Sequence, residues 1–302
     1  MNAPILITVY DRLESLNKCI KSIIRCPESL SSTLYIASDA PYKPEDTEKV
    51  SMIRDYIRSI KGFQKVVLLD SKVNIGSYNN LHSNMKYILN IHDNVIFIED
   101  DNVVNDNFLS FMNGSLAAYK NDGKIKFVCS YLFPDCAPKS KHDIFLWSGF
   151  SPWGFATWRE SWKEINFDND SLYEKNHSIK NALKLWFIDP SSLGVLMEDI
   201  QGKVKATDVR ICYNLILLSG YSVFPKRCVS VNRGHDGNGE HKSNNDIYIK
   251  QKLSAINPII QSNLTVEKRI AIYMFFHRLN LKNIYHLIKF LIIDVKARVL
   301  AR

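Results

Sequence analysis

The first hundred residues alternate two patterns of apolar and polar positions. Short runs of apolar, mostly β-branched residues predict buried strands, and they lie at residues 4–10, 33–38, 65–70 and 95–99. Between them, apolar residues recur every three to four positions, which predicts helices at 13–24, 43–60 and 74–91. Strands that alternate with helices indicate a mainly parallel sheet with helices on its faces. The predicted fold class is therefore α/β.

After residue 106 the pattern is less regular. We expect helices at 107–120 and 208–219 and strands at 126–131 and 220–226, with a loop rich in Pro, Cys and Lys at 133–143. These elements predict one α/β unit over residues 1–242, in two halves, 1–106 and 107–242. A helical, basic tail is expected over 243–302.

An acidic triplet, Glu99, Asp100 and Asp101, follows the strand predicted at 95–99. Open α/β sheets gather their ligands at the carboxyl ends of strands. Mg²⁺ and Mn²⁺ prefer hard oxygen ligands and use only one or two protein carboxylates, and such a cation would offset the repulsion among the three charges. The triplet therefore indicates either a cation site or a solvated loop.

Two further segments carry candidate chemistry. The glycine-rich stretch 233–241, RGHDGNGEH, contains His235 and His241, which are either metal or phosphate ligands or parts of an ordinary surface loop. Asp208 opens a predicted helix, where it is either a first-turn acid or a base for a hydroxyl group. Glu198 and Asp199 are rival candidates for the base.

The segment 145–162 holds four of the five tryptophans. Within it, SGFSPWG mixes small residues with aromatic rings, a composition that suits the apolar floor of a sugar or base pocket. The alternative is that these rings are simply core residues.

Charge and composition narrow the function classes. The chain of 302 residues has a net charge of +8, and residues 265–302 account for +6 of it, so the remainder is nearly neutral and a broad nucleic-acid-binding face is not expected. The six cysteines show no CxxC pair, which favours free thiols. No signal peptide or membrane-spanning run is evident, so we expect a cytoplasmic protein.

The tail ends in a segment, 283–302, with apolar residues on one helical face; His286, Lys289, Lys296 and the preceding Lys282 gather on the opposite face. Such a helix either docks on the main domain or lies on an anionic membrane surface.

Taken in order, these segments resemble the GT-A glycosyltransferases. The narrower resemblance is to inverting, metal-dependent N-acetylglucosaminyltransferases of the N-glycan type and their bacterial polysaccharide relatives. The stretches that carry it are APILITVYDR, IASDAP, VIFIEDDNVVNDNFLSFM, SGFSPWGFATW, the helix led by Asp208 and the loop that ends at His241. KATDVRI is poorer in tryptophan than the family's base region, and the N-terminal membrane anchor of the animal members is absent.

The resemblance implies a role for each matching residue. Asp39 would bind the uracil of a UDP-sugar and Arg12 would lie near the base or phosphates. The other donor-binding residues would be Asn74, Gly76, Glu99 and Asp100, the last two beside the ribose and sugar. Asp101 and His241 would hold Mn²⁺ or Mg²⁺, and Asp208 would be the base. The acceptor pocket would comprise Trp147, Gly149, Trp153 and Gly154.

The implied activity is the transfer, with inversion, of GlcNAc or another hexose or HexNAc to a hydroxyl of a glycan or lipid-linked oligosaccharide. Surface polysaccharide or lipopolysaccharide synthesis at the inner membrane, with the tail on the membrane surface, would be its setting. The alternatives are a metal-dependent sugar nucleotidyltransferase and a non-enzymatic peripheral membrane adaptor.

Overall fold

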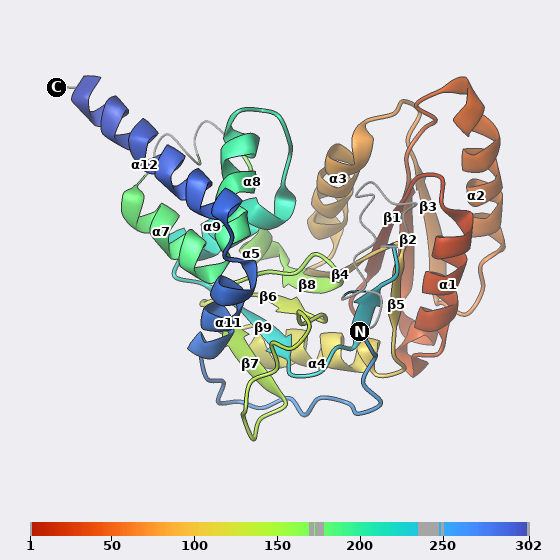
Figure 1. Ribbon diagram of the computed structural model, residues 1–302. Coiled ribbons are helices and arrows are strands. Elements are labelled where there is room, and N and C mark those ends of the chain that lie inside the picture. Colours follow the sequence, from red (N-terminus) through yellow and green to blue (C-terminus); the bar gives the residue numbers. More distant parts are fainter. Residues whose placement is uncertain (1, 169–171, 173–177, 235–247, 249–250, 301–302) are drawn as a thin grey trace.

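The computed structural model describes residues 2–168, 172, 178–234, 248 and 251–300. An eight-stranded sheet is flanked by helices on both faces (Figure 1). The strands are β1 (Ile5–Val9), β2 (Thr33–Ser38), β3 (Lys65–Asp70), β4 (Asn94–Glu99), β5 (Asn102–Val104), β6 (Ile125–Cys129), β7 (Ile144–Trp147), β8 (Phe155–Trp158), β9 (Tyr221–Pro225) and β10 (Ser230–Asn232). The α-helices are α1 (Leu13–Ile24), α2 (Thr47–Ser59), α3 (Gly76–Ile91), α4 (Phe108–Tyr119), α5 (Arg159–Glu164), α7 (Ile179–Ile188), α8 (Pro190–Ile200), α9 (Thr207–Leu217), α11 (Lys268–Arg278) and α12 (Leu281–Leu300); the 3₁₀ turns are η1 (Pro27–Ser31) and η2 (Pro44–Asp46).

The large sheet has the order β3-β2-β1-β4-β8-β6-β9-β7. Strands β3, β2, β1 and β4 are parallel, whereas β8 and β7 run antiparallel to their neighbours. The chain builds outward from β1 to β3 and then returns to place β4 on the other side of β1. The carboxyl ends of β1 and β4 therefore flank a topological switch point, the usual ligand position in such sheets.

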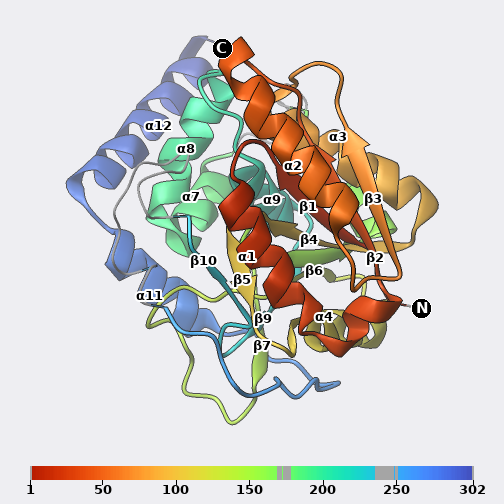
Figure 2. The same ribbon diagram turned by 90° about the vertical axis from the view of Figure 1, so that its right-hand side faces the viewer.

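Alternating side chains of β1 divide the core into two layers. Ile5, Ile7 and Val9 pack with α1, α2 and α4 on one face, and Leu6 packs with α3 and the later helices on the other. Figure 2 shows α1 and α2 in front of the parallel strands. Burial on both faces explains why β1, β2 and β4 are continuous apolar runs in the sequence, whereas β3 is a partly exposed edge strand.

A second, two-stranded sheet joins distant parts of the chain. β5, directly after the acidic triplet, pairs antiparallel with β10, so that Asn102 lies opposite Asn232. The pairing brings the start of the glycine-rich stretch to the end of β4.

The predicted fold class, α/β with a mainly parallel sheet and helices on both faces, is confirmed. The segment 145–162 forms strands β7 and β8 and helix α5, and α7 and α8 occupy a region that the sequence pattern left without predicted elements. All six cysteines are buried and free, in agreement with the predicted free thiols.

The residues after the glycine-rich stretch are packed against the rest of the fold. The strap 251–266 crosses the domain: Asn105 Nδ2 donates to the Ser254 carbonyl oxygen at 2.7 Å, and Leu146 N donates to the Thr265 carbonyl oxygen at 2.8 Å. α11 then packs on α7, and α12 packs on α8. None of the helices described is both long and apolar enough to cross a membrane.

Candidate active site

The acidic triplet lies at the switch point and is bridged by an arginine from the neighbouring strand. Arg12, three residues after β1, donates through Nη1 to Asp101 Oδ2 at 2.8 Å and through Nη2 to Asp100 Oδ1. Asp100 is only 3% exposed, whereas the Arg12 side chain is 32% exposed. Arg12 thus already supplies a positive charge at the position where the sequence predicts a cation.

The other oxygen of Asp101 is held from β10. Asn232 Nδ2 donates to Asp101 Oδ1 at 2.8 Å, and the Asp101 carbonyl oxygen accepts from Arg233 N at 2.9 Å. Gly234 N donates to Asn232 Oδ1 at 2.7 Å, which fixes the turn. Sequence reasoning missed Asn232, because no local pattern signals a contact that depends on the pairing of β5 with β10.

The electrostatics of the triplet follow from burial and crowding. Burial raises the pKa of Asp100 to about 7, although Arg12 opposes that rise. Burial, followed by the charges of Asp101 and Asp100, raises the pKa of Glu99 well above its ordinary value. Burial on its own would lower the pKa of Arg12, but Asp100 and Asp101 outweigh it and raise that pKa. Three carboxyl groups thus share one guanidinium, and a further positive charge at this place would stabilise the ionised forms of Glu99 and Asp100.

The residues after β2 and β3 that are expected to bind the UDP-sugar form one cluster. The Asp39 carboxylate accepts from Gly76 N at 2.8 Å, from Ala40 N at 2.8 Å and from Ile75 N at 3.1 Å, so it holds the first turn of α3. Asn74 Nδ2 donates to the Ala40 carbonyl oxygen at 2.7 Å. Gly76 has a φ of +77°, which glycine adopts without strain. The structure therefore brings Asp39, Asn74 and Gly76 together, and contact with a nucleotide stays a prediction.

Asp208 lies in the first turn of α9. Its charge is the weakest of five influences on the pKa of Glu99, and it acts to raise that pKa. The preceding residue, Thr207, ties α9 to α3 through its Oγ1, which is 2.9 Å from His82 Nε2. Burial, followed by the nearby charge of Arg210, lowers the pKa of His82 to about 4, so this imidazole is neutral at neutral pH.

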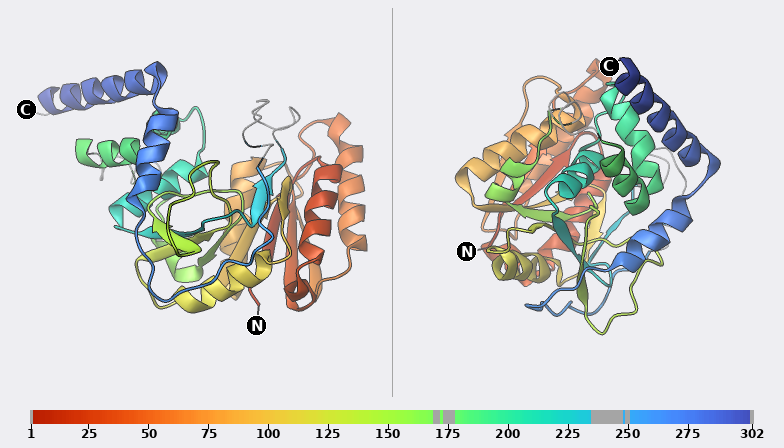
Figure 3. Two further views of the ribbon diagram at one scale, coloured as in Figure 1. Left: turned by 60° about the horizontal axis from the view of Figure 1, so that its bottom comes forward. Right: turned by 90° about the vertical axis from the view of Figure 1, so that its left-hand side faces the viewer.

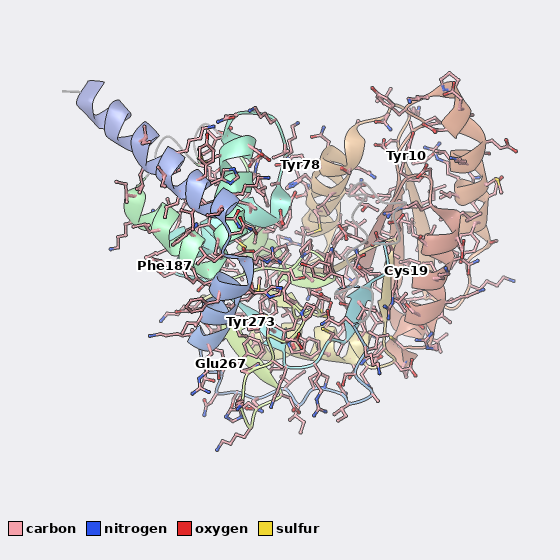
Figure 4. The ribbon with its side chains drawn as sticks, viewed as in Figure 1. Tyr10, Cys19, Tyr78, Phe187, Glu267 and Tyr273 are labelled. Atoms are coloured by element: carbon pink, nitrogen blue, oxygen red, sulfur yellow. The ribbon has the colours of Figure 1, made fainter. Side chains whose placement is uncertain are left out.

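The rival base Asp199 is part of a buried ion pair. Arg210 donates to both its oxygens, Nε to Oδ2 at 2.6 Å and Nη2 to Oδ1 at 2.7 Å, and Asp199 is fully buried. Arg210 Nη1 also donates to Tyr78 Oη at 2.7 Å. Tyr78 comes from α3 and lies between that helix and α8 (Figure 4). Through Tyr78, the ion pair joins the two halves of the molecule. The other rival, Glu198 on α8, is partly exposed, and its charge opposes the lowering of the pKa of His286 on α12.

The four expected acceptor residues separate into two pairs. Trp147 is a core residue, 4% exposed, and its ring fills the space beside Gly149, where a Cβ would lie 2.5 Å from it. Trp153 is partly exposed and lies edge-on to Tyr131, with a centroid distance of 4.6 Å. Its carbonyl oxygen accepts from Ser230 of β10 at 2.7 Å. Trp153 and its neighbour Gly154 thus adjoin the strand that also carries Asn232, and contact with an acceptor stays a prediction.

The metal assignment rests on Asp101, since His241 and His235 lie outside the described residues. Among the residues that are described, no group of three or more His, Cys, Asp and Glu side chains is arranged as a metal-binding cluster. Mn²⁺ and Mg²⁺ are commonly held by one or two carboxylates together with substrate oxygens, so the Asp101–Asp100 pair fits such an ion. Gly234 packs directly against the Asp101 carboxylate, because a Cβ there would lie 2.1 Å from Asp101 Oδ2.

This close approach predicts the effect of Gly234→Ala. The added methyl group must displace the Asp101 carboxylate from Arg12 and Asn232, so we expect Mn²⁺-dependent UDP affinity to fall by about tenfold or more, measured by calorimetric titration. Gly123→Ala is the matched control, since its Cβ meets nothing within 4 Å, and it should leave affinity unchanged. Equal affinities for the two variants would contradict the role given to Gly234.

Comparisons with known proteins add the following. No family model matches this sequence, and no curated protein matches it. Among solved structures, the chain is similar to S. aureus TarS 1–349 (TM-score 0.44, 10% identity, 78% of this chain and 61% of that one) and to GalNAc-T7 with UDP, GalNAc and Mn²⁺ (0.49, 13%, 75% and 42%). It is also similar to mannosyltransferase PcManGT from Pyrobaculum calidifontis in complex with GDP-Man and Mn²⁺ (0.37, 13%, 59% and 47%). The chain thus spans less than two thirds of the length of each of these three proteins.

Proposed function

We propose that the chain is a GT-A type, metal-dependent, inverting glycosyltransferase that moves a sugar from a UDP-sugar to a hydroxyl group. The observation that carries the proposal is the position of Asp101: it lies at the switch point, contacted by Arg12 from the turn after β1 and by Asn232 from β10, with the charge of Asp208 acting on the neighbouring Glu99. The diphosphate group of a nucleoside diphosphate is stabilised by positive charge and by a carboxylate-held cation at such a place.

In the proposed reaction Asp208 accepts the proton of the acceptor hydroxyl. The acceptor oxygen attacks the anomeric carbon from the face opposite the diphosphate, the bond between that carbon and the diphosphate oxygen breaks, and UDP leaves with inversion of configuration. Asp101, with Asp100 beside it, would hold Mn²⁺ or Mg²⁺, which when bound supplies Lewis-acid stabilisation of the departing diphosphate. Arg12 contributes a second positive charge, and Trp153 offers a partly exposed ring for a sugar.

The finer assignments belong to the same proposal. The transferred sugar is GlcNAc or another hexose or HexNAc. The acceptor is a glycan or a lipid-linked oligosaccharide in surface polysaccharide or lipopolysaccharide synthesis, on the cytoplasmic face of the membrane.

Thermal denaturation with nucleotide tests the proposal. UDP together with Mn²⁺ should raise Tm, because a ligand at 100 times its Kd adds about 2.7 kcal/mol to the free energy of unfolding. UDP alone should have a much smaller effect. A screen of UDP-sugars for UDP release in the presence of Mn²⁺ then identifies the donor. A Tm that does not respond to UDP with Mn²⁺ would contradict the proposal and favour a non-enzymatic adaptor.

The alternative of a sugar nucleotidyltransferase predicts a different product. That reaction releases pyrophosphate and calls for a glycine-rich, basic loop after the first strand. Here β1 passes into α1 through only Tyr10, Asp11 and Arg12, and Arg12 is paired with the triplet. Release of UDP rather than pyrophosphate is therefore the expected result.

A further inference from the structure

Helix α12 presents apolar residues on two opposite sides. On its inner side Phe290 is buried in the core, and His286 contacts α8 so closely that a Cβ on Gly194 would lie 2.0 Å from the His286 ring. On its outer side large apolar residues remain exposed: Leu281 by 86%, Tyr285 by 58%, Ile288 by 51% and Ile292 by 50%. Each apolar face of a helix normally packs against a partner, so the outer side of α12 calls for one.

These four outer residues form one stripe. Their spacing of four, three and four positions places them on a single line along a helix with 3.6 residues per turn, opposite the face that meets α8. Lys282 and Lys289 lie on one flank of this outer stripe, and Lys282 is exposed. Figure 3 shows α12 at the end of the molecule away from α1 and α2, where it projects beyond the other helices.

We propose that the outer stripe, Leu281, Tyr285, Ile288 and Ile292, lies on an anionic membrane surface. Apolar side chains would enter the boundary between headgroups and acyl chains, while the flanking lysines meet the headgroup phosphates. Charge favours this occupant over a second copy of the chain. Residues 265–302 carry eight basic and two acidic residues, so two such segments repel one another, whereas an anionic bilayer attracts each of them.

The helix would lie along the surface. The stripe extends over 12 residues, about 17 Å, and none of the described helices can cross a bilayer. Because α12 packs on α8, and α8 leads into α9 with Asp208, the membrane would adjoin the acceptor half of the molecule. This last step rests on the proposed function, and it identifies the acceptor as one held in a lipid layer.

Vesicle flotation of the full chain tests the surface. The wild-type protein should float with phosphatidylcholine vesicles that contain phosphatidylglycerol, and much less with phosphatidylcholine alone or in high salt. The double variant Ile288→Ser/Ile292→Ser should partition about tenfold more weakly. Lys282→Gln should reduce binding to the anionic vesicles by about fivefold. Ile91→Ser/Met52→Ser, at 54% and 52% exposure on α3 and α2, is the matched control and should bind like the wild type.

Flotation and the Tm response to UDP with Mn²⁺ test the membrane proposal and the proposed activity separately. A stripe variant that keeps its Tm response to UDP with Mn²⁺ but loses flotation supports the membrane proposal. If the stripe and control variants float equally, or if the wild type forms a dimer that Ile288→Ser/Ile292→Ser dissociates while no vesicles bind, the proposal is overturned. Flotation of the wild type without any Tm response to UDP with Mn²⁺ would support the membrane proposal and contradict the proposed activity.

Discussion

Asp208→Asn should lower kcat by about 10³-fold, the usual contribution of a general base, and leave the affinity for the UDP-sugar within about twofold. Asparagine keeps the size of the side chain but cannot take the acceptor proton. The residues assigned to the UDP-sugar follow or end β1, β2, β3 and β4, and none of them lies on α9. Steady-state kinetics with the donor identified by the UDP-release screen, together with UDP titration, separate the two effects.

Asp199→Asn is the informative control for this variant. Asparagine removes the negative charge that accepts from Arg210 Nε and Nη2 in the buried site beside Tyr78, which should cost about 3–5 kcal/mol of unfolding free energy. The folded fraction should retain its turnover. Should Asp208→Asn lose nucleotide affinity as strongly as kcat, Asp208 would belong to the donor site, and an unchanged kcat would remove it from the base role.

The first half of the fold was predictable because its signals are local. Each of the four parallel strands is a short apolar run, and the helix between the first two ends before Pro27. The predicted boundaries of β2 and β3, 33–38 and 65–70, match the structure. β1, β2 and β4 are buried on both faces, which is the environment that such continuous apolar runs indicate.

The second half depends on contacts that sequence periodicity does not express. β7 and β8 have four residues each, too short for a clear alternation, and they pair with β9, β4 and β6. α8 contains Ser191, Ser192 and Gly194, weak helix formers, and it is held by the Asp189 cap and by packing against α12. Tertiary contacts therefore decide these elements.

The candidate site was predictable where its residues follow strands. Arg12 and Asp101 could be placed together because parallel strands end on one edge of a sheet. Asn232 could not, since its contact with Asp101 arises from a pairing between segments about 130 residues apart in the chain. The same distinction applies to Trp147. The composition of the segment around it suited a pocket, but the antiparallel pairing of β7 with β9 places the Trp147 side chain in the core.

Asp101→Asn should abolish the effect of Mn²⁺ on UDP binding. The substitution removes the negative charge but keeps the size of the side chain beside Gly234, so the turn at β10 is preserved. Loss of the cation's stabilisation of the departing diphosphate should also reduce turnover by about 10³-fold or more, since metal ions contribute several kcal/mol to such transition states. Calorimetric titration of UDP with and without Mn²⁺ measures the first effect, and UDP release measures the second.

Asp106→Asn provides the matched control, because Asp106 also pairs with an arginine, Arg25, at 2.8 Å, but on an exposed part of the surface beyond β5. That variant should titrate like the wild type and lose less than about 1 kcal/mol of stability. If Asp101→Asn responds to Mn²⁺ as the wild type does, the metal is held elsewhere, and the carboxylates at the switch point serve only as partners of Arg12. Because every assigned role at this edge of the sheet depends on the charge of Asp101, this titration decides between a catalytic site and a structural ion-pair cluster.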